Sequence, residues 1–474
     1  MKIPEIEKLY LAQTNEVPEE IKQISVHGSN RSYYRIKSKN YQYLAAVNSD
    51  IRENKAFIYL GNYFRSQNLN VPEIFSVNDE NTIYLLEDLG DTTLYEYITA
   101  KENRFDNETL VIYQNVLKHL LDFQFSGQNG LDYSICYPRY AFDRQSMQWD
   151  LNYFKYYFLK LAQIPFDEQL LENDFETLID ILLKSDSEYF LYRDFQSRNI
   201  MLKDEKAYFI DFQGGRKGAL QYDVASLLYD AKAEIPQPVR AELLDFYISE
   251  LQKRKNINPD EFKTQFYCFV LIRIMQAMGS YGFRGFYEGK SHFLKSILPA
   301  LENIRLLLEQ QFLPDSLNYL KNILNAITKS ERLRKLVPEE IPSEKLTVQI
   351  FSFSYKKGYP VDVSGNGGGY LFDCRALPNP GRFTEYKTLT GKDQPVIDFL
   401  EREEHVETFV SNAFMLVEQS VKVYIERGFT HLLVGFGCTG GQHRSVYCAE
   451  RMKKLLSSNF DCNIQIIHRE QNFN

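Results

Sequence analysis

The spacing of hydrophobic positions changes several times along the chain and predicts its elements. Residues 41–47 and 82–86 are short apolar runs with the composition of strands. Between them, a stretch with helical spacing places Phe57, Leu60 and Phe64 on one face. The start of the chain is therefore predicted to form strands around a helix.

The rest of the chain shows two further patterns, separated by a polar segment. Long helical patterns dominate from residue 107 to 330, with a strand-rich interruption at 189–213. Residues 337–344, which follow the last helical pattern, contain two prolines and three glutamates, a composition typical of a linker. Strands and helices then alternate, as in an α/β domain. The predicted parts are 1–90, 91–336, the linker 337–344 and 345–474.

Composition and charge narrow the class of protein. The chain has 474 residues and a net charge of -8. Residues 345–474 carry 15 Lys+Arg and 14 Asp+Glu, so the acidity belongs to residues 1–344. Neither part has the basic excess of a general nucleic-acid binder. The 33 Tyr and 34 Phe against 1 Trp are an aromatic bias that we interpret as packing.

Several features of the sequence predict a cytoplasmic protein with no membrane partner. No stretch approaches ~18 consecutive apolar residues, the length that a membrane-spanning helix needs. The N-terminal residues lack the apolar core of a signal peptide. The six cysteines form no C-x-x-C pair, which argues against a disulfide framework or a structural zinc site.

An acid, an asparagine and a second acid stand at the spacing of a phosphotransfer site. Asp194 is followed five residues later by Asn199, and an apolar strand then ends at Asp211. Asp194 would orient an acceptor hydroxyl and take its proton, while Asn199 and Asp211 would offer hard oxygen ligands to Mg²⁺. We therefore predict catalysis by Asp194, with Mg²⁺ and ATP as cofactors. A plain strand–turn–strand with solvated acids is the alternative.

The residues around this site resemble a known family. Residues 189–201, Tyr-Phe-Leu-Tyr-Arg-Asp-Phe-Gln-Ser-Arg-Asn-Ile-Met, are similar to the catalytic loop of the aminoglycoside phosphotransferase superfamily. Within it they most resemble the sugar 1-kinases of cell-wall recycling, whose loop reads roughly H-R-D-F-H-S-R-N-L-M. Tyr192 and Gln196 stand where that loop has histidines. The resemblance implies an α+β bilobal protein-kinase-like fold, with a small β-rich N-lobe at 1–90 and a helical C-lobe at 91–336, followed by a separate α/β domain.

The resemblance implies roles for residues that support the site. Glu87 and Leu89 fall at the hinge between the lobes, whose backbone would bond adenine. Asp223 falls at the buried acid that braces the catalytic loop, and a role as a helix N-cap is compatible with this. The hinge and the brace would fix the nucleotide and the catalytic loop on either side of the cleft.

The acceptor side is also implied by the resemblance. The family approaches its sugar at positions that correspond here to Asp143, Arg144 and Asp150. Arg198 would either face the substrate or brace the loop. The predicted acceptor is an N-acetyl amino sugar, phosphorylated at its anomeric hydroxyl. An aminoglycoside-like or choline-like acceptor is the alternative, because an acidic kinase part also suits cationic ligands.

The predicted nucleotide loop departs from the usual kinase pattern. It has one glycine, and its backbone amides would contact the phosphates. The usual strand lysine is absent, so Arg31 or Arg35 would replace it, with a contact worth roughly 1.5–3 kcal/mol. A non-catalytic pseudokinase regulator is the alternative. The predicted nucleotide-binding residues of this loop are Gly28, Ser29, Asn30 and Arg31.

A second constellation lies near the C-terminus. An apolar strand runs into a glycine-rich turn and then into a helix, an arrangement that binds anions through free backbone amides. The spacing Cys438-x₅-Arg444-Ser445 also satisfies the cysteine-phosphatase loop, in which a thiolate attacks phosphate. The predicted anion-binding residues are Cys438, Thr439, Gly440, Gly441, His443, Arg444 and Ser445.

The surroundings of this turn resemble the C-terminal domain of the RapZ family. The likeness is carried by residues 351–360, 372–380, 389–393 and 437–445, and it adds Arg375 to the anion site. It implies a phosphosugar ligand such as glucosamine-6-phosphate, and also RNA binding. The near-neutral charge and the tail at 468–474, which has no basic run, make RNA a doubtful partner.

Overall fold

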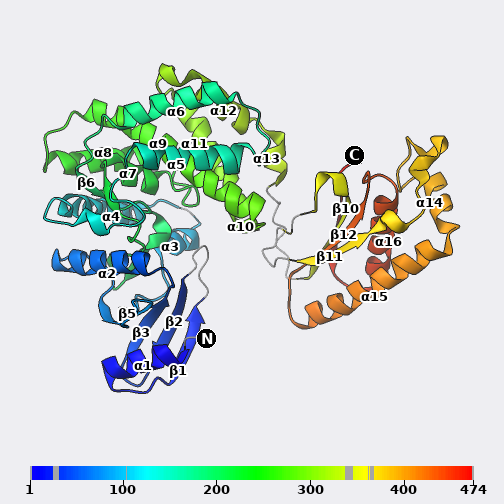
Figure 1. Cartoon of the computed structure of the whole chain (residues 1–474), viewed down its shortest axis with the longest axis horizontal. Helices are drawn as coiled ribbons and strands as arrows, with labels where there is room; N and C mark the ends of the chain where they lie inside the picture. The colour runs from blue at the N-terminus through cyan, green and yellow to red at the C-terminus, as the bar shows by residue number, and fades with distance from the viewer. Residues whose placement is uncertain are drawn as a thin grey trace. The chain divides into compact units, whose positions relative to one another are not determined.

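The computed structural model describes residues 3–24, 31–102, 104–336, 345–360, 362 and 368–471. Contacts within the chain divide it into two compact units, residues 1–283 with 296–334 and residues 284–295 with 335–474. The predicted linker at 337–344 lies outside the described residues, so the predicted domain boundaries stay a prediction. Each unit has its own sheet (Figure 1).

The N-terminal lobe of the first unit is an antiparallel sheet with two helices. The sheet order is β1-β2-β3-β5-β4. Asp50 caps α2 by accepting from the amides of Arg52 and Glu53, and α2 buries the predicted face of Phe57, Leu60 and Phe64. The elements are α1 Ile3–Thr14, β1 Glu20–Ile24, β2 Ser32–Lys37, β3 Gln42–Val47, α2 Ile51–Ser66, β4 Ile74–Val77 and β5 Ile83–Glu87.

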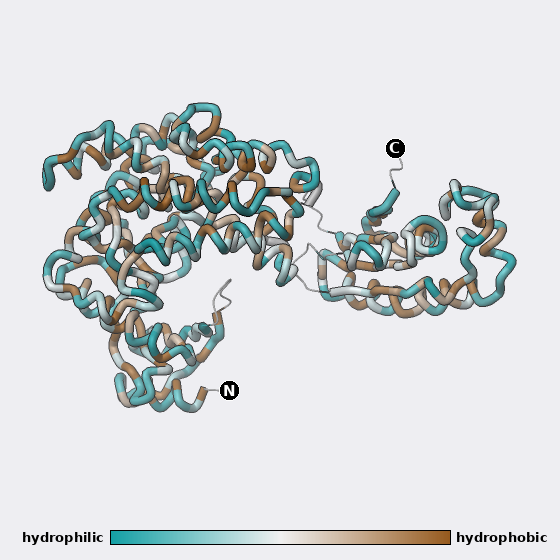
Figure 2. The backbone as a smooth tube through the Cα atoms, turned by 45° about the horizontal axis from the view of Figure 1, so that its top comes forward, coloured by the Kyte–Doolittle hydropathy of each residue, from teal (hydrophilic) through white to brown (hydrophobic). Residues whose placement is uncertain are grey.

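The second lobe is helical, and its hydrophobic positions recur along each helix (Figure 2). Its longest helix, α9 (Pro259–Tyr281), is buried on all sides from Cys268 to Met275, so it lies at the centre of the lobe. The other helices of this lobe are α3 Leu94–Ala100, α4 Asn107–Ser126, α5 Arg144–Tyr153, α6 Glu168–Leu182, α7 Gln221–Leu228, α8 Gln237–Gln252, α11 Ile297–Glu309, α12 Asn318–Thr328 and α13 Glu331–Leu336. The short helix α10 (Ser291–Leu294) lies in the segment that is grouped with the second unit.

The predicted strand-rich interruption forms two small antiparallel pairs. β6 (Tyr189–Leu191) pairs with β9 (Arg216–Gly218), and β7 (Ile200–Lys203) pairs with β8 (Lys206–Phe209). The catalytic-loop residues connect the two pairs. A continuous set of aromatic rings from both lobes packs beneath them, which accounts for part of the aromatic bias. Its members are Phe57, Phe64, Phe123, Phe190, Tyr192, Phe195, Phe209 and Phe212.

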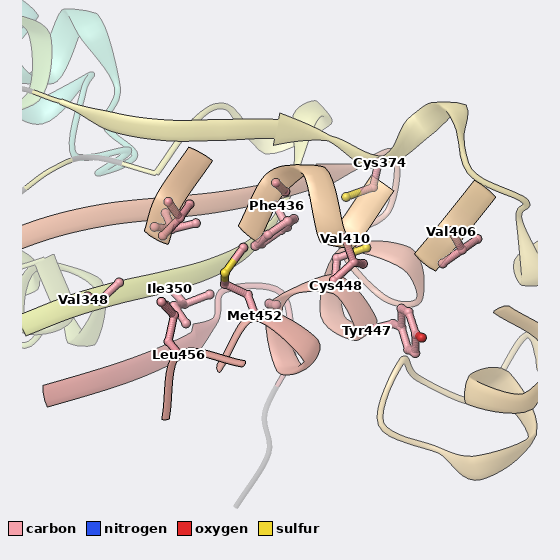
Figure 3. Packing of buried hydrophobic residues seen from close by; sticks show 14 of the residues in the cluster. Val348, Ile350, Cys374, Val406, Val410, Phe436, Tyr447, Cys448, Met452 and Leu456 are labelled. Atoms are coloured by element: carbon pink, nitrogen blue, oxygen red, sulfur yellow. The ribbon is translucent and has the colours of Figure 1, made fainter. Parts of the chain in front are cut away.

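The C-terminal unit contains a parallel four-stranded sheet, in the order β11-β12-β10-β13. Residues of α16 pack against Val348 and Ile350 of β10 and Phe436 of β12 in its core (Figure 3). The predicted kinase-like fold with a following α/β domain is confirmed. The elements here are β10 Thr347–Ser354, β11 Gly369–Asp373, α14 Gln394–Glu401, α15 Glu404–Glu426, β12 His431–Cys438, α16 Arg444–Asn459 and β13 Asn463–His468.

Candidate functional site

The catalytic loop contains backbone conformations that side chains rarely adopt. Arg193 has a φ of 82° and Asp211 a φ of 67°, both in the left-handed region. Such residues cost of order 1–3 kcal/mol each and persist only where their surroundings hold them in place. Three carboxylates from other elements, described next, hold this loop.

The first of these carboxylates belongs to Asp223. It accepts the backbone N–H groups of Tyr192 at 2.7 Å and Arg193 at 2.9 Å. Burial raises the pKa of the Asp223 carboxyl to about 7, against the lowering effect of those two hydrogen bonds. Asp223 stands in the first turn of α7 and not at its N-cap, which is Leu220. The geometry is that of a brace, and the N-cap interpretation is wrong.

Asp150 and Asp230 are the other two carboxylates. Asp150, from α5, binds both terminal nitrogens of Arg193 at 2.7 and 2.8 Å. Asp230 accepts from the hydroxyl of Ser197 at 2.7 Å and from its amide at 3.3 Å. Sequence reasoning missed the role of Asp230, because nothing in its local pattern indicates a partner 33 positions earlier.

The three predicted catalytic and metal-binding residues lie together. The Asn199 side-chain nitrogen donates to the backbone oxygen of Asp194 at 2.8 Å and lies 3.3 Å from Asp211 Oδ2. The side chain of Asp194 is 44% exposed, so an acceptor can reach it. Burial, followed by the nearby charge of Asp194, raises the pKa of the Asp211 carboxyl.

These residues fit a divalent cation. A buried carboxylate with a like charge beside it is stabilised when a cation binds, and the Asn199 side-chain oxygen adds a hard ligand. The described residues contain no group of three or more His, Cys, Asp and Glu side chains suited to a metal. Mg²⁺ does not need one, because it commonly uses one or two carboxylates together with substrate phosphates.

Arg31 lies near the predicted metal-binding residue Asp211. Its guanidinium is 3.0 Å from Glu53 at the start of α2, and its charge acts on Asp211. Arg35, the other candidate, binds Asp88 at 2.6 Å and Asp91 at 2.9 Å. The geometry therefore favours Arg31 as the phosphate-side cation. The sequence analysis did not identify Glu53 as the partner of Arg31. The other predicted residues of the nucleotide loop, Gly28, Ser29 and Asn30, lie outside the described residues.

Replacing Arg31 should weaken nucleotide use more than replacing Arg35. A charge-assisted contact is worth about 1.5–3 kcal/mol, so Arg31→Gln should lower kcat/KM for ATP by about 10–100-fold. Arg35→Gln should stay within about threefold of the wild type. Steady-state kinetics with varied ATP check this, and equal losses in both variants would contradict the assignment.

The predicted hinge connects β5 to the helical lobe. Lys203 of β7 contacts the Glu87 carboxylate at 3.1 Å and the backbone oxygen of Asp88 at 3.1 Å. Together with the Arg35–Asp88 pair, this fixes the backbone next to the buried Leu89. Adenine binding by Glu87 and Leu89 stays a prediction.

The predicted acceptor residues are mostly engaged with the protein itself. Asp143 caps α5 by accepting from the Ser146 amide. Arg144 forms exposed ion pairs with acids of α6, and Asp150 is occupied by Arg193. Arg198 is exposed on the catalytic loop. Their contact with substrate stays a prediction, and Arg198 is the one of the four without an ion pair among the described residues.

In the C-terminal unit, the predicted turn connects β12 to α16 as expected. The amide of Gly441 donates to the Cys438 sulfur at 3.1 Å, and the Ser445 hydroxyl lies 3.2 Å from it. Burial alone would raise the pKa of the Cys438 thiol, but these hydrogen bonds outweigh it and the pKa is lowered. Cys438 is only 3% exposed, which disfavours the cysteine-phosphatase interpretation because a nucleophile must be reached by its substrate.

The cationic residues of this turn have different surroundings. Arg444 is buried and donates to the backbone oxygens of Arg375 and Leu377, so it holds the neighbouring loop. Nε2 of His443 lies 2.8 Å from the backbone oxygen of Tyr386. Arg375 is exposed, although its guanidinium donates to both carboxylate oxygens of Asp373. Thr439 and Gly440 form an exposed tip. The open part of the predicted anion site therefore consists of Thr439, Gly440 and Arg375.

The kinase-like fold and this catalytic loop agree with a known family of phosphotransferases. The phosphotransferase enzyme family (APH) matches residues 20–257, half of the chain, and the RapZ C-terminal domain matches residues 346–472. The protein thus belongs to the APH phosphotransferase family and carries a RapZ-type C-terminal domain. Members of this family are phosphotransferase enzymes.

Individual relatives match only parts of the chain. A nucleotide-binding protein of Acinetobacter baylyi is 39% identical over 128 residues, which are 27% of this chain and 43% of that protein. The chain spans about half the length of the curated relatives it matches. Among solved structures, an ethanolamine kinase of Plasmodium vivax has a TM-score of 0.47 at 13% identity, covering 62% of this chain and 84% of that one. A streptomycin–ATP complex of APH(2″)-IIa has a TM-score of 0.42 at 15% identity, covering 60% and 95%.

None of the helices in the described part of the chain has the length and apolar character that a membrane crossing requires.

Proposed function

We propose that the kinase part phosphorylates the anomeric hydroxyl of an N-acetyl amino sugar, using ATP and Mg²⁺. The observation that carries the proposal is the meeting of Asp194, Asn199 and Asp211 on a loop held by Asp223. The likeness of the loop to sugar 1-kinases supports the acceptor. The intact brace and the Arg31–Glu53 pair favour an active enzyme over a pseudokinase.

The residues of the site have separate tasks in this proposal. The exposed carboxylate of Asp194 orients the acceptor hydroxyl and takes its proton. Asn199 fixes the backbone of Asp194 through its side-chain nitrogen. Asp211 and Asn199 would hold Mg²⁺, which neutralises phosphate charge when bound. Arg31, held by Glu53, offers a cation to the phosphates from the other lobe.

The acceptor is tested by ³¹P NMR of reactions with ATP, Mg²⁺ and candidate sugars. We expect a sugar 1-phosphate from N-acetylglucosamine or N-acetylmuramic acid. If the folded wild-type protein forms neither product, the acceptor proposal fails. An aminoglycoside phosphate or phosphocholine in its place would establish the alternative acceptor class.

We further propose that the C-terminal domain binds a phosphosugar at the exposed tip of its glycine-rich turn. The start of the 16-residue helix α16 provides a favourable end of the helix dipole for an anion. A Cβ at Gly440 would meet no heavy atom within 4 Å, so there is open space at the tip. Arg375 adds an exposed guanidinium nearby, since its backbone is bound by Arg444 at the start of α16.

Thermal shift with glucosamine-6-phosphate tests the second site. We expect the phosphosugar to stabilise the wild type, and Arg375→Gln to weaken binding about tenfold through loss of one charged contact. Lys387→Gln, on the same unit, is the matched control and should bind normally. Arg444→Ala is unsuitable, because it removes two structural hydrogen bonds. If the phosphosugar stabilises Arg375→Gln as much as the wild type, Arg375 is not part of the binding site. Release of inorganic phosphate from the phosphosugar would favour the phosphatase interpretation.

A further inference from the structure

Arg273 is a buried cation directed at the catalytic carboxylate. It lies in the fully buried part of α9 and is 6% exposed. Its Nε donates to the Ser226 hydroxyl at 3.0 Å, and Nη1 donates to the side-chain oxygen of Gln276. Its Nη2 is 3.7 Å from Asp194 Oδ1. Among the described residues, Asp194 is the only carboxylate within 4 Å of this guanidinium.

Two other buried cations of the same lobe have carboxylates of their own, whereas the buried Arg216 and Arg240 have none within 4 Å among the described residues. Lys155 is paired with Glu168 and Glu172, and Arg193 is paired with Asp150 in a two-pronged contact. Removing a guanidinium from water is costly unless an anion compensates it. Arg273 has for this purpose only the group that must also receive the acceptor hydroxyl. The positive charge of Arg273 therefore acts on any acceptor that binds at Asp194.

A second guanidinium acts on the same region. Arg198 is exposed, and no carboxylate of the described residues lies within 4 Å of it. Burial raises the pKa of the Tyr281 phenol, and the charges of Arg198 and Arg273 both act against that rise. Both guanidinium groups are therefore near one buried phenol. The carboxylate of Asp230 acts on the same phenol in the opposite direction, so it offsets part of this positive charge.

A small cavity adjoins these groups. Its volume is about 20 Å³, room for about one water molecule, and Arg273 and Tyr281 form part of its wall. The other polar groups of the wall are hydroxyls and amides together with one acid: Gln196, Ser226, Tyr229, Asp230 and Asn303. At this size the cavity holds a water molecule and not an acceptor, and Asp230 is the one acid in its wall.

We propose that Arg273 is an acceptor-specificity residue, which makes the site select acceptors that are neutral or anionic next to the reacting hydroxyl and reject those with an ammonium group. This deepens the proposed sugar kinase function and rests on it for the choice of test sugars. An ammonium group held a few ångströms from a buried guanidinium is repelled, which corresponds to roughly 10–100-fold in kcat/KM at the effective dielectric of a protein site. Choline-like and aminoglycoside acceptors are therefore disfavoured by charge and not by size.

The test compares two acceptors that differ in charge at one position. N-acetylglucosamine is neutral at its nitrogen, while glucosamine, at a pH where its amine is protonated, is cationic. We expect the wild type to prefer N-acetylglucosamine by at least about tenfold in kcat/KM. Arg273→Gln should lower this preference about tenfold, while Arg273→Lys, which keeps the charge, should leave it within about threefold. Arg254→Gln, which removes a guanidinium paired with Asp122, is the matched control and should leave the preference unchanged.

Arg198→Gln provides a second test if Arg273→Gln does not fold. Arg198→Gln changes an exposed side chain and should lower the same preference severalfold. An Arg273→Gln protein that loses activity equally toward both sugars would reduce Arg273 to a structural support and overturn the proposal. It is also overturned if the wild type prefers choline or kanamycin, or turns over no acceptor. If a neutral or anionic compound other than a sugar is the substrate, the proposed sugar acceptor fails while the charge selection by Arg273 stands.

Discussion

Asp194→Asn is expected to lower kcat by about 10²–10⁴-fold, the usual contribution of a positioned general base. The amide keeps the size of the side chain but cannot take the acceptor proton. KM for ATP should stay within about twofold, because the proposed phosphate contacts come from Arg31 and from residues other than the Asp194 carboxylate. Steady-state measurement of ADP formation with a turned-over acceptor checks both parameters.

The control for this substitution is Asp245→Asn. Asp245 forms an exposed ion pair with Lys263 on the same lobe, and such pairs contribute about 0–1 kcal/mol to stability. Its kinetics should match the wild type. An Asp194→Asn protein that is folded and as active as the wild type would refute the role of Asp194 and with it the catalytic mechanism.

Asp150→Ala is expected to lower the free energy of unfolding of the kinase unit by about 3–5 kcal/mol. The change leaves the guanidinium of Arg193 without its two-pronged partner in a largely buried place. It also releases a residue whose left-handed backbone directly precedes Asp194, so kcat should fall as well. Urea unfolding followed by a probe in the kinase unit measures the loss.

Two further variants separate the pair from general damage. Arg144→Ala removes exposed ion pairs from the same helix and should cost no more than about 1 kcal/mol. The double variant Asp150→Leu/Arg193→Met removes both charges and should regain much of the stability, because replacing a buried pair by apolar groups is often neutral. It should not regain activity. If Asp150→Ala is as stable as the wild type, groups other than Asp150 compensate the charge of the buried Arg193 guanidinium.

Much of the fold was predictable because its signals are local. The helical face of Phe57, Leu60 and Phe64 and the apolar runs that became β3 and β5 follow from side-chain periodicity alone. The second part was predictable in the same way, because strands that alternate with helices form parallel sheets. The role assigned to Asp223 depended on the family resemblance, and the structure gives it a physical basis in two backbone hydrogen bonds.

The catalytic group was predictable because its members stand close together in sequence. Asp194 and Asn199 are separated by one short turn, and Asp211 ends the hairpin that follows. The partners Glu53, Asp230 and Arg273 were not predictable, because each reaches the site from another element and has no local motif. Asp150 was placed on the substrate side, whereas the structure shows its carboxylate bound to Arg193.

The sequence by itself determined the kind of protein: a phosphotransferase loop with its acid, amide and second acid, and a separate α/β domain with a glycine-rich turn. Short-range spacing is sufficient for such features, because the chain geometry brings those residues together wherever the segment folds. Only the tertiary structure decided which charges are paired. It places Arg31 with Glu53, Arg193 with Asp150 and Arg444 with backbone oxygens, and it leaves Arg273 facing Asp194. Pairing depends on distance and burial across elements far apart in the chain, and these follow from packing rather than from any local pattern.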